Sequence, residues 1–229
     1  MDHTTSLALA TTAFVGTHLL MSHPLRAPLV ARLGSGGFSG LYSLVAAVTL
    51  GWMIFAYRGG EPGVPLWVAP DWAWWAASAV MLVASILLVG SLIGNPAFPH
   101  PGAAPKEIPP PKGVFAITRH PMNWSFMLWA GTHIALIGTA RNLIVAIGIL
   151  LLALVGSIGQ DRKKAGLLGD TWRDWQARTS FIPFGALAGG RVKASQMAPG
   201  AVALVGGIIL WAAVTWFHAP QWGVRALFG

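Results

Sequence analysis

Residues 113–133 are GVFAITRHPMNWSFMLWAGTH, a polar and basic approach that turns at Pro121 into an apolar helix. Proline suits the first helical position, because the N–H that it lacks would have no partner there. Free backbone N–H groups and the positive end of the helix dipole then lie beside Arg119 and His120, which predicts an anion site. Further along, His133 lies in an apolar run, and an ionisable residue at membrane depth is a candidate functional residue. Basic residues at the start of a membrane helix, with a histidine further along it, indicate a cofactor held inside a membrane bundle.

Composition assigns the chain to the membrane class. Of its 229 residues, 55% are hydrophobic and only 10% are charged, whereas soluble domains carry about 25% charged residues. The absence of cysteine excludes disulfides, cysteine-ligated zinc, iron–sulfur clusters and covalent haem attachment through C-x-x-C-H. The net charge of +8 fits cytoplasmic loops facing anionic lipid. No nucleic-acid reader motif is present, so we expect no nucleic-acid partner.

Six apolar runs approach the roughly 20 residues that a membrane-spanning helix needs. They cover residues 4–21, 37–57, 72–94, 121–138, 142–159 and 199–218. The first run is not a typical signal peptide, because Asp2 makes its start acidic and no clear Ala-x-Ala site follows. The sequence therefore predicts an all-α polytopic membrane helix bundle of about six transmembrane helices, forming one domain over residues 1–229.

The distribution of basic residues predicts the orientation. Loops 22–36, 95–120 and 160–198 hold every lysine and arginine except Arg58, Arg141 and Arg225. The positive-inside rule places these loops in the cytoplasm. We therefore expect a multi-pass protein of the bacterial inner membrane with both termini outside the cytoplasm.

Two of the cytoplasmic loops have distinctive compositions. Residues 95–112 contain seven prolines, which predicts an extended, semi-rigid spacer. Residues 160–184 predict a cytoplasmic interfacial helix, because apolar and basic residues recur there at helical spacing. Pro183 would end that helix. Its apolar face would consist of Leu167, Leu168, Trp172 and Trp175.

The histidines divide into two groups. His3, His100 and His218 lie at boundaries or in the proline-rich loop, and we expect them to be solvated. His133 lies about 18 Å along its helix from Pro121 and about 140° around it from His120. These two histidines should not face one cofactor, so a second metal ligand must come from another helix. The remaining histidines are His18 and His23, and His18 is the candidate.

Two interpretations of His133 stay open from the residues alone. It can be a neutral imidazole that hydrogen-bonds across helices, as polar side chains in membrane bundles do. Its small neighbour Ala130 and the aromatic Phe126 and Trp129 instead favour a flat macrocycle against the helix. Haem b with His18 and His133 as axial ligands is the natural hypothesis, because haem iron accepts histidine ligands.

The different depths of His18 and His133 along their helices limit this hypothesis. His18 lies about 6 Å from the cytoplasmic end of its helix and His133 about 18 Å from the start of its own. Axial ligands of one iron need nearly equal depth, so helix extension or tilt must make up the difference. Otherwise His23 and His120 form the better-matched, shallower pair.

Four segments together resemble the NnrU family over most of the chain. They are residues 17–26 (THLLMSHPLR), 40–45 (GLYSLV), 118–122 (TRHPM) and 128–133 (LWAGTH). The resemblance implies a link to nitric-oxide metabolism in denitrifying bacteria. It also implies kinship with the zeta-carotene cis–trans isomerases, which are membrane proteins that bind haem b. His18 and His133 match the positions associated with axial ligands there. In the plant isomerases a cysteine precedes the second histidine by three residues, and the residue here is Ala130, so ligand exchange through that cysteine is impossible.

A second resemblance concerns the isoprenylcysteine and phospholipid methyltransferases. Its motifs are Gly113 with Arg119-His120-Pro121, and the later 181–183 segment (FIP). In those enzymes the Arg-His-Pro region helps to hold S-adenosylmethionine. They usually carry a glutamate pair at the start of the later motif, where this chain has Gln160-Asp161.

The sequence therefore supports several functional hypotheses. The first is a haem b protein of the NnrU type, in which Arg119 and His120 serve haem propionates or an anionic substrate. It would act in nitric-oxide metabolism, or as a haem-dependent cis–trans isomerase of a lipophilic polyene. The alternatives are an S-adenosylmethionine-dependent membrane methyltransferase and a non-catalytic haem carrier or assembly factor. The expected partners are the lipid bilayer and either a lipophilic substrate or nitric oxide.

Overall fold

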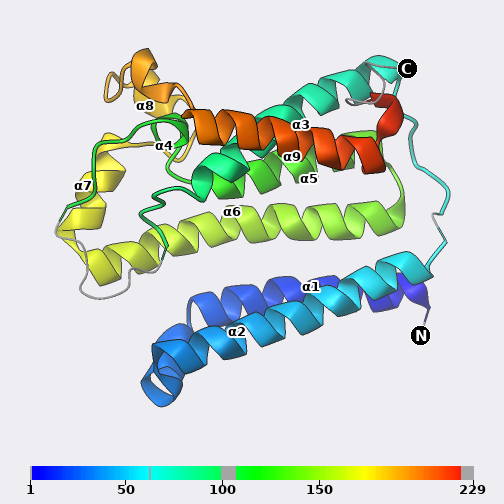
Figure 1. Ribbon diagram of the computed structural model, residues 1–229. Coiled ribbons are helices and arrows are strands. Elements are labelled where there is room, and N and C mark those ends of the chain that lie inside the picture. The colour runs from blue at the N-terminus through cyan, green and yellow to red at the C-terminus, as the bar shows by residue number, and fades with distance from the viewer. Residues whose placement is uncertain (1, 62, 99–106, 223–229) are drawn as a thin grey trace. The chain divides into compact units, whose positions relative to one another are not determined.

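The computed structural model describes residues 2–61, 63–98 and 107–222 (Figure 1). Within these ranges the chain forms helices and no β-strand, which confirms the all-α class. The helices are α1 (His3–Ser22), α2 (Arg26–Gly59), α3 (Asp71–Ser91), α4 (Val114–Ile117), α5 (Pro121–Leu136), α6 (Ala140–Leu168), α7 (Asp170–Arg178), α8 (Gly185–Ala188) and α9 (Ala201–His218). Short 3₁₀ turns cover Ala194–Met197 (η1) and Pro220–Trp222 (η2).

Five helices in the described part of the chain are long and apolar enough to cross a membrane: α1, α2, α3, α6 and α9. Large apolar side chains on them are exposed, such as Phe55 at 77%, as lipid-facing side chains are. The protein is thus a polytopic helical membrane protein. The predicted fourth span is α5, which begins at Pro121 as expected but has only 16 residues. Its rise of about 24 Å is shorter than the hydrocarbon core of about 30 Å.

The chain divides into two compact units, one of residues 1–69 and 130–159, the other of residues 70–129 and 160–229. Both α5 and α6 begin in one unit and end in the other. We describe each unit by itself. The single domain over residues 1–229 stays a prediction.

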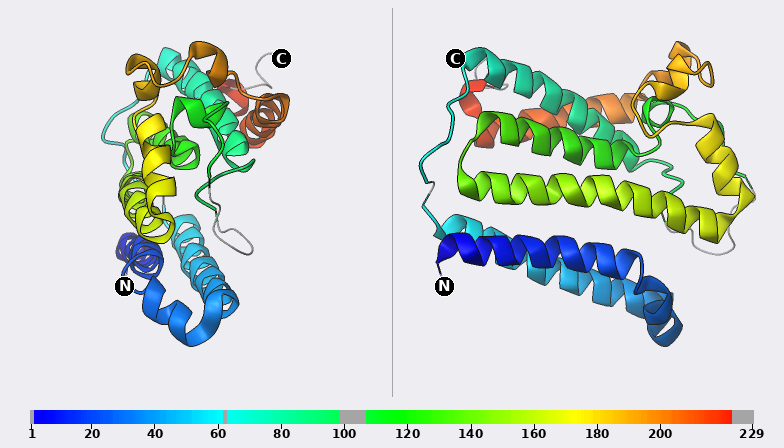
Figure 2. Two further views of the ribbon diagram at one scale, coloured as in Figure 1. Left: turned by 90° about the vertical axis from the view of Figure 1, so that its left-hand side faces the viewer. Right: turned by 180° about the vertical axis from the view of Figure 1, so that it is seen from behind.

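In the first unit, α1 and α2 form an antiparallel pair (Figure 2). His3 lies against Gly59 at one end of the pair, and Ser22 Oγ lies 3.3 Å from the Tyr42 hydroxyl at the other. The first part of α6 packs on the same pair. The buried core consists of Leu7, Ala10, Phe14, Met53 and Ala56, with Ile144, Val145 and Ile149 of α6 packed against it.

Helix α2 is longer than its predicted span because it continues past a bend. The predicted span began at residue 37, whereas α2 begins at Arg26 and contains one non-helical residue, Gly34, with φ 69°. Glycine adopts this left-handed conformation without a Cβ clash. The bend therefore lets the chain turn while the helix extends beyond its apolar part.

In the second unit, α3 and α9 lie antiparallel and very close together. Trp211 Nε1 donates to the Ser78 carbonyl at 3.0 Å. A Cβ at Gly207 would lie 2.6 Å from Ile86 Cα, so the backbones touch where glycine removes the side chain. Small residues permit this close approach between membrane helices.

The segment predicted as one interfacial helix divides at Gly169, which has φ 56°. Helix α6 runs to Leu168 and α7 follows from Asp170. Trp172 and Trp175 are 0% and 2% exposed in a core with Leu87, Ile108 and Phe115. Their apolar face is thus covered by the chain itself. Of the proline-rich loop, residues 107–112 are not helical, and residues 99–106, with His100, lie outside the described residues.

Candidate functional site

The Thr118–Pro121 turn is hydrogen-bonded to residues 180–181, about sixty residues later in the chain. Thr118 Oγ1 donates to the Phe181 carbonyl at 2.7 Å. The Arg119 backbone N–H donates to the Ser180 carbonyl at 2.8 Å. Trp124 of α5 donates its indole N–H to the same Phe181 carbonyl at 2.8 Å. The two motifs of the methyltransferase resemblance therefore lie side by side in the second unit.

A polar cluster joins this turn to α6, at the point where α6 leaves its apolar run. Asp161 accepts from Arg119 Nη2 at 2.7 Å and Nε at 2.8 Å. Its other oxygen lies 3.0 Å from His120 Nε2, and His120 Nδ1 lies 3.1 Å from Gln160 Oε1. The His120 side chain is 1% exposed. Arg119 is thus paired with a carboxylate within the protein, and its role as an anion contact stays a prediction.

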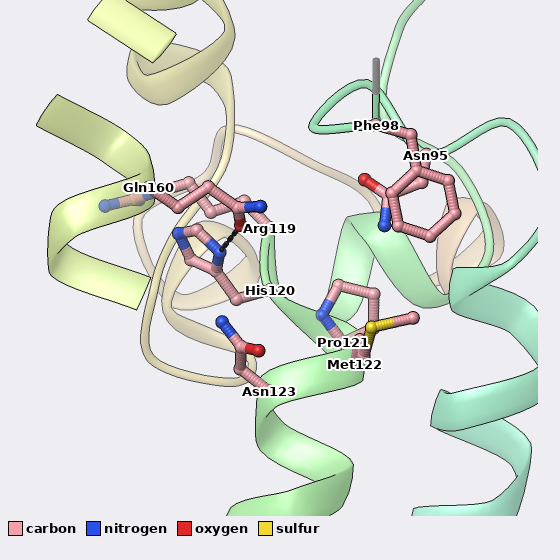
Figure 3. Close-up of a pocket in the computed structure, with 8 residues that line it drawn as sticks. All are labelled: Asn95, Phe98, Arg119, His120, Pro121, Met122, Asn123 and Gln160. Carbon is pink, nitrogen blue, oxygen red and sulfur yellow. Dashed lines mark hydrogen bonds between the residues drawn. The ribbon is translucent and has the colours of Figure 1, made fainter. Parts of the chain in front are cut away.

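A small, partly enclosed pocket of about 30 Å³ opens beside this cluster (Figure 3). Its described lining residues are Asn95, Phe98, Arg119, His120, Pro121, Met122, Asn123 and Gln160. The pocket therefore lies at the start of α5, where the sequence predicted an anion site. Asn95 and Asn123 were not predicted, because single carboxamides in a loop or a helix start have no recognisable pattern.

One ring nitrogen of His18, in the first unit, is bonded to the backbone of its own helix. Its Nδ1 lies 2.7 Å from the Phe14 carbonyl one turn earlier in α1. A donated Nδ1–H leaves Nε2 with its lone pair, and metal-binding histidines commonly orient their rings in this way. The rings of Phe14 and Tyr42 lie 4.2 and 5.4 Å from the imidazole, measured between centroids.

The level of His18 follows from the packing of α1 on α6. Gly148 faces Thr11, and Gly159 faces the His23 ring so closely that a side chain at either glycine would overlap. The later residue of α6 faces the later residue of the N-terminal segment, so α1 and α6 run parallel. This register places His18 level with about residue 155 of α6.

His133 lies at another level of the same unit. Asn142, near the start of α6, donates to the His133 carbonyl at 2.8 Å. Asn142 also donates to the Ile137 carbonyl at 2.7 Å, so it lies at the end of α5. Because α5 and α6 run antiparallel, the His133 backbone lies about three residues deeper, level with about residue 145 of α6. The backbones of His18 and His133 are thus separated by roughly ten residues of α6, or about 15 Å at 1.5 Å per residue. In this register the backbones of the two histidines lie at different levels of the unit. Bis-histidine coordination by His18 and His133 stays a prediction.

The other predicted residues lie on α5, in the turn before it and directly after α1. Phe126 is 41% exposed and Ala130 is 0% exposed, so only the alanine faces protein. Trp129 is half-buried. In the fallback metal pair, His23 belongs to the first unit and His120 to the second. Among the residues that the structure describes, no three histidine, aspartate or glutamate side chains gather as a metal site.

Comparison with known proteins gives a family and two relatives. The family model described as NnrU protein matches residues 6–226. The chloroplastic 15-cis-zeta-carotene isomerase of Zea mays is 31% identical over 81 residues, which are 35% of this chain and 22% of the maize protein. That of Arabidopsis thaliana is 33% identical over 79 residues, 34% of this chain and 22% of the plant protein. The chain thus matches about a fifth of each relative's length. No solved structure matches.

Proposed function

The chain belongs to the NnrU family, and from this membership we propose that it is a membrane-embedded cis–trans isomerase of a lipophilic polyene. The two relatives are isomerases by name, and each shares only a segment with this chain. The exposed apolar surface of the helices supports a substrate that arrives through the bilayer.

The observation that carries the proposal is His18 on its apolar helix. Isomerisation about a double bond neither adds nor removes atoms, so it needs no water and no net proton acceptor. An apolar site whose one imidazole holds a redox-active metal would suit this reaction. His18 would hold a haem through Nε2, while its bond to the Phe14 carbonyl orients the ring. When bound, the iron would supply a redox-active centre beside the conjugated chain. Phe14 and Tyr42 would exclude water around the imidazole.

The same geometry supports a second candidate, the binding of nitric oxide. With the His133 backbone about 15 Å away in helix register, His18 would hold the haem without His133, and the haem would bind a small molecule such as nitric oxide. A non-catalytic haem carrier would also bind haem through His18. Turnover of a polyene would distinguish an isomerase from a nitric-oxide-binding protein and from a haem carrier.

The methyltransferase alternative is supported by a different observation, the meeting of residues 118–121 with residues 180–184. The ion pair of Arg119 with Asp161 counts against it, because that arginine is already engaged by a carboxylate.

An absorption spectrum of the purified full-length chain in detergent tests the proposal. We expect a b-type haem that pyridine extracts, because the chain has no cysteine to form a thioether. Conversion of a cis polyene to its trans isomer by the same preparation, followed by chromatography, tests the activity. A colourless protein that binds S-adenosylmethionine in calorimetry would replace the isomerase with the methyltransferase.

A further inference from the structure

The non-helical segment of residues 63–69, which follows α2 in the first unit, exposes apolar side chains. Val64, Leu66 and Val68 are 88%, 73% and 86% exposed. Residues 63–69 contain no charged side chain. Exposed apolar surface of this kind marks contact with a membrane or with another protein. The segment is called the strap below.

The strap is bonded to the turn between α5 and α6. The Leu66 backbone N–H donates to the Gly138 carbonyl at 2.9 Å, and an antiparallel bridge to the same turn follows at Val68. The Trp67 ring packs on Gly138 so closely that an added Cβ would lie 2.6 Å from a ring carbon. The contact therefore leaves no space for water between the strap and the turn.

The carbonyl groups at the end of α5 are bonded within the protein. Trp67 donates its indole N–H to the Ala135 carbonyl at 2.9 Å. Asn142 donates to the carbonyls of His133 and Ile137 at 2.8 and 2.7 Å. The last carbonyls of a helix lack partners along the helix, and where water is scarce they need donors from elsewhere in the protein. The arrangement thus suits a turn that lies at the boundary of a membrane.

Arg141 indicates the level of the strap in the membrane. Its Nη1 donates to the Gly60 carbonyl at 2.9 Å, and its guanidinium lies 4.8 Å from the centre of the Tyr57 ring. Arginine and tyrosine have apolar bodies and polar ends, which favour the membrane–water boundary. The strap begins three residues after Gly60, and the turn that it contacts directly precedes α6. The strap therefore lies at the same boundary.

The strap continues a surface that faces lipid. Helix α2 exposes large apolar side chains, and Phe55 near its end is one of them. From this continuity, the exposed apolar side chains and the closed turn, we infer that the strap inserts Val64, Leu66 and Val68 among the lipids at the boundary between headgroups and acyl chains. The inference is independent of the isomerase proposal, which concerns the ligand of a haem.

The absence of cysteine from the chain allows a single label to be placed in the strap. Val64→Cys and Val68→Cys each receive a nitroxide, and the full-length variants are placed in phosphatidylcholine vesicles. Electron paramagnetic resonance then compares collisions of the nitroxide with oxygen, which concentrates in lipid, and with a polar nickel chelate, which stays in water. The lipid reference is Phe55→Cys on α2, and the water reference is Asp170→Cys, whose native side chain is 98% exposed.

We expect the oxygen-to-nickel ratio in the strap to lie within about twofold of the lipid reference and about tenfold above the water reference, because transfer of the polar chelate into an apolar layer is unfavourable. Ratios that match the water reference would overturn the inference. Labels shielded from both reagents would also overturn it, because a second copy of the chain or another protein would then cover the strap.

Photo-crosslinking of the unaltered chain decides the outcome if a labelled variant does not fold. A phosphatidylcholine that carries a diazirine near the carboxyl end of one acyl chain should label residues 63–69 as well as α2. Labelling of α2 without labelling of residues 63–69 would contradict lipid insertion of the strap.

Discussion

Asp161 lies 2.7 Å from Arg119 Nη2 and closes an ion pair between the turn before α5 and the polar end of α6. Its second oxygen lies 3.0 Å from the buried His120 ring. The carboxylate thereby bonds to both Arg119 and His120. These two basic residues before a proline had predicted an open anion site. The pairing engages Arg119 within the protein and gives Asp161 a structural role.

Asp161→Asn should lower the free energy of unfolding by about 3 kcal/mol, because removal of one partner of a buried pair leaves the other charge uncompensated. Thermal unfolding in detergent measures this as a lower melting temperature. The control is Asp170→Asn, whose side chain is 98% exposed and pairs with the exposed Arg173, and it should cost about 0.5 kcal/mol or less. Equal losses in the two variants would contradict the structural role of Asp161.

Gly207→Ala should destabilise the second unit by about 1–3 kcal/mol, because the added Cβ overlaps the α3 backbone at Ile86. Gly131→Ala on α5 is the matched control, since its Cβ would meet nothing within 4 Å. Alanine should be neutral or stabilising there by up to about 1 kcal/mol. The comparison is again a thermal melt. A neutral effect at Gly207 would mean that α3 and α9 do not touch as described.

His18→Ala should lose most of the bound haem, because it removes the ligand whose Nε2 faces away from the helix backbone. His133→Ala should keep the haem and its spin state, because His133 lies about 15 Å from the level of His18. Absorption spectra and pyridine extraction measure both. Loss of haem, or a change from low to high spin, in His133→Ala would instead support the bis-histidine pair of the sequence prediction.

Reporters fused to each terminus should both lie outside the cytoplasm. The bias of lysine and arginine toward three loops requires an even number of crossings. The 16-residue α5 is the critical segment, because it is shorter than the other candidate spans. Reporters on opposite sides of the membrane would show an odd number of crossings, with α5 the first segment to examine.

Local sequence determined most of the helices. Apolar runs of about 20 residues predicted α1, α3 and α9 closely, because length and hydrophobicity decide whether a segment enters a bilayer. Pro121 marked the start of α5 for an equally local reason, since proline pre-sets the backbone of a first turn. The motifs of the NnrU resemblance likewise lie in short contiguous segments.

Only the tertiary structure decided which of these residues meet. His18 and His133 share a unit but not a level, because Gly148 and Gly159 set the register of α6 on α1. Asp161 and Lys164 lie three residues apart in a charged stretch of the sequence. In the second unit Asp161 pairs with Arg119, and Lys164 donates to the Phe98 carbonyl. Helix formation depends on neighbours along the chain, whereas register and burial depend on side-chain packing between helices distant in sequence. The composition of one segment carries no information about that packing.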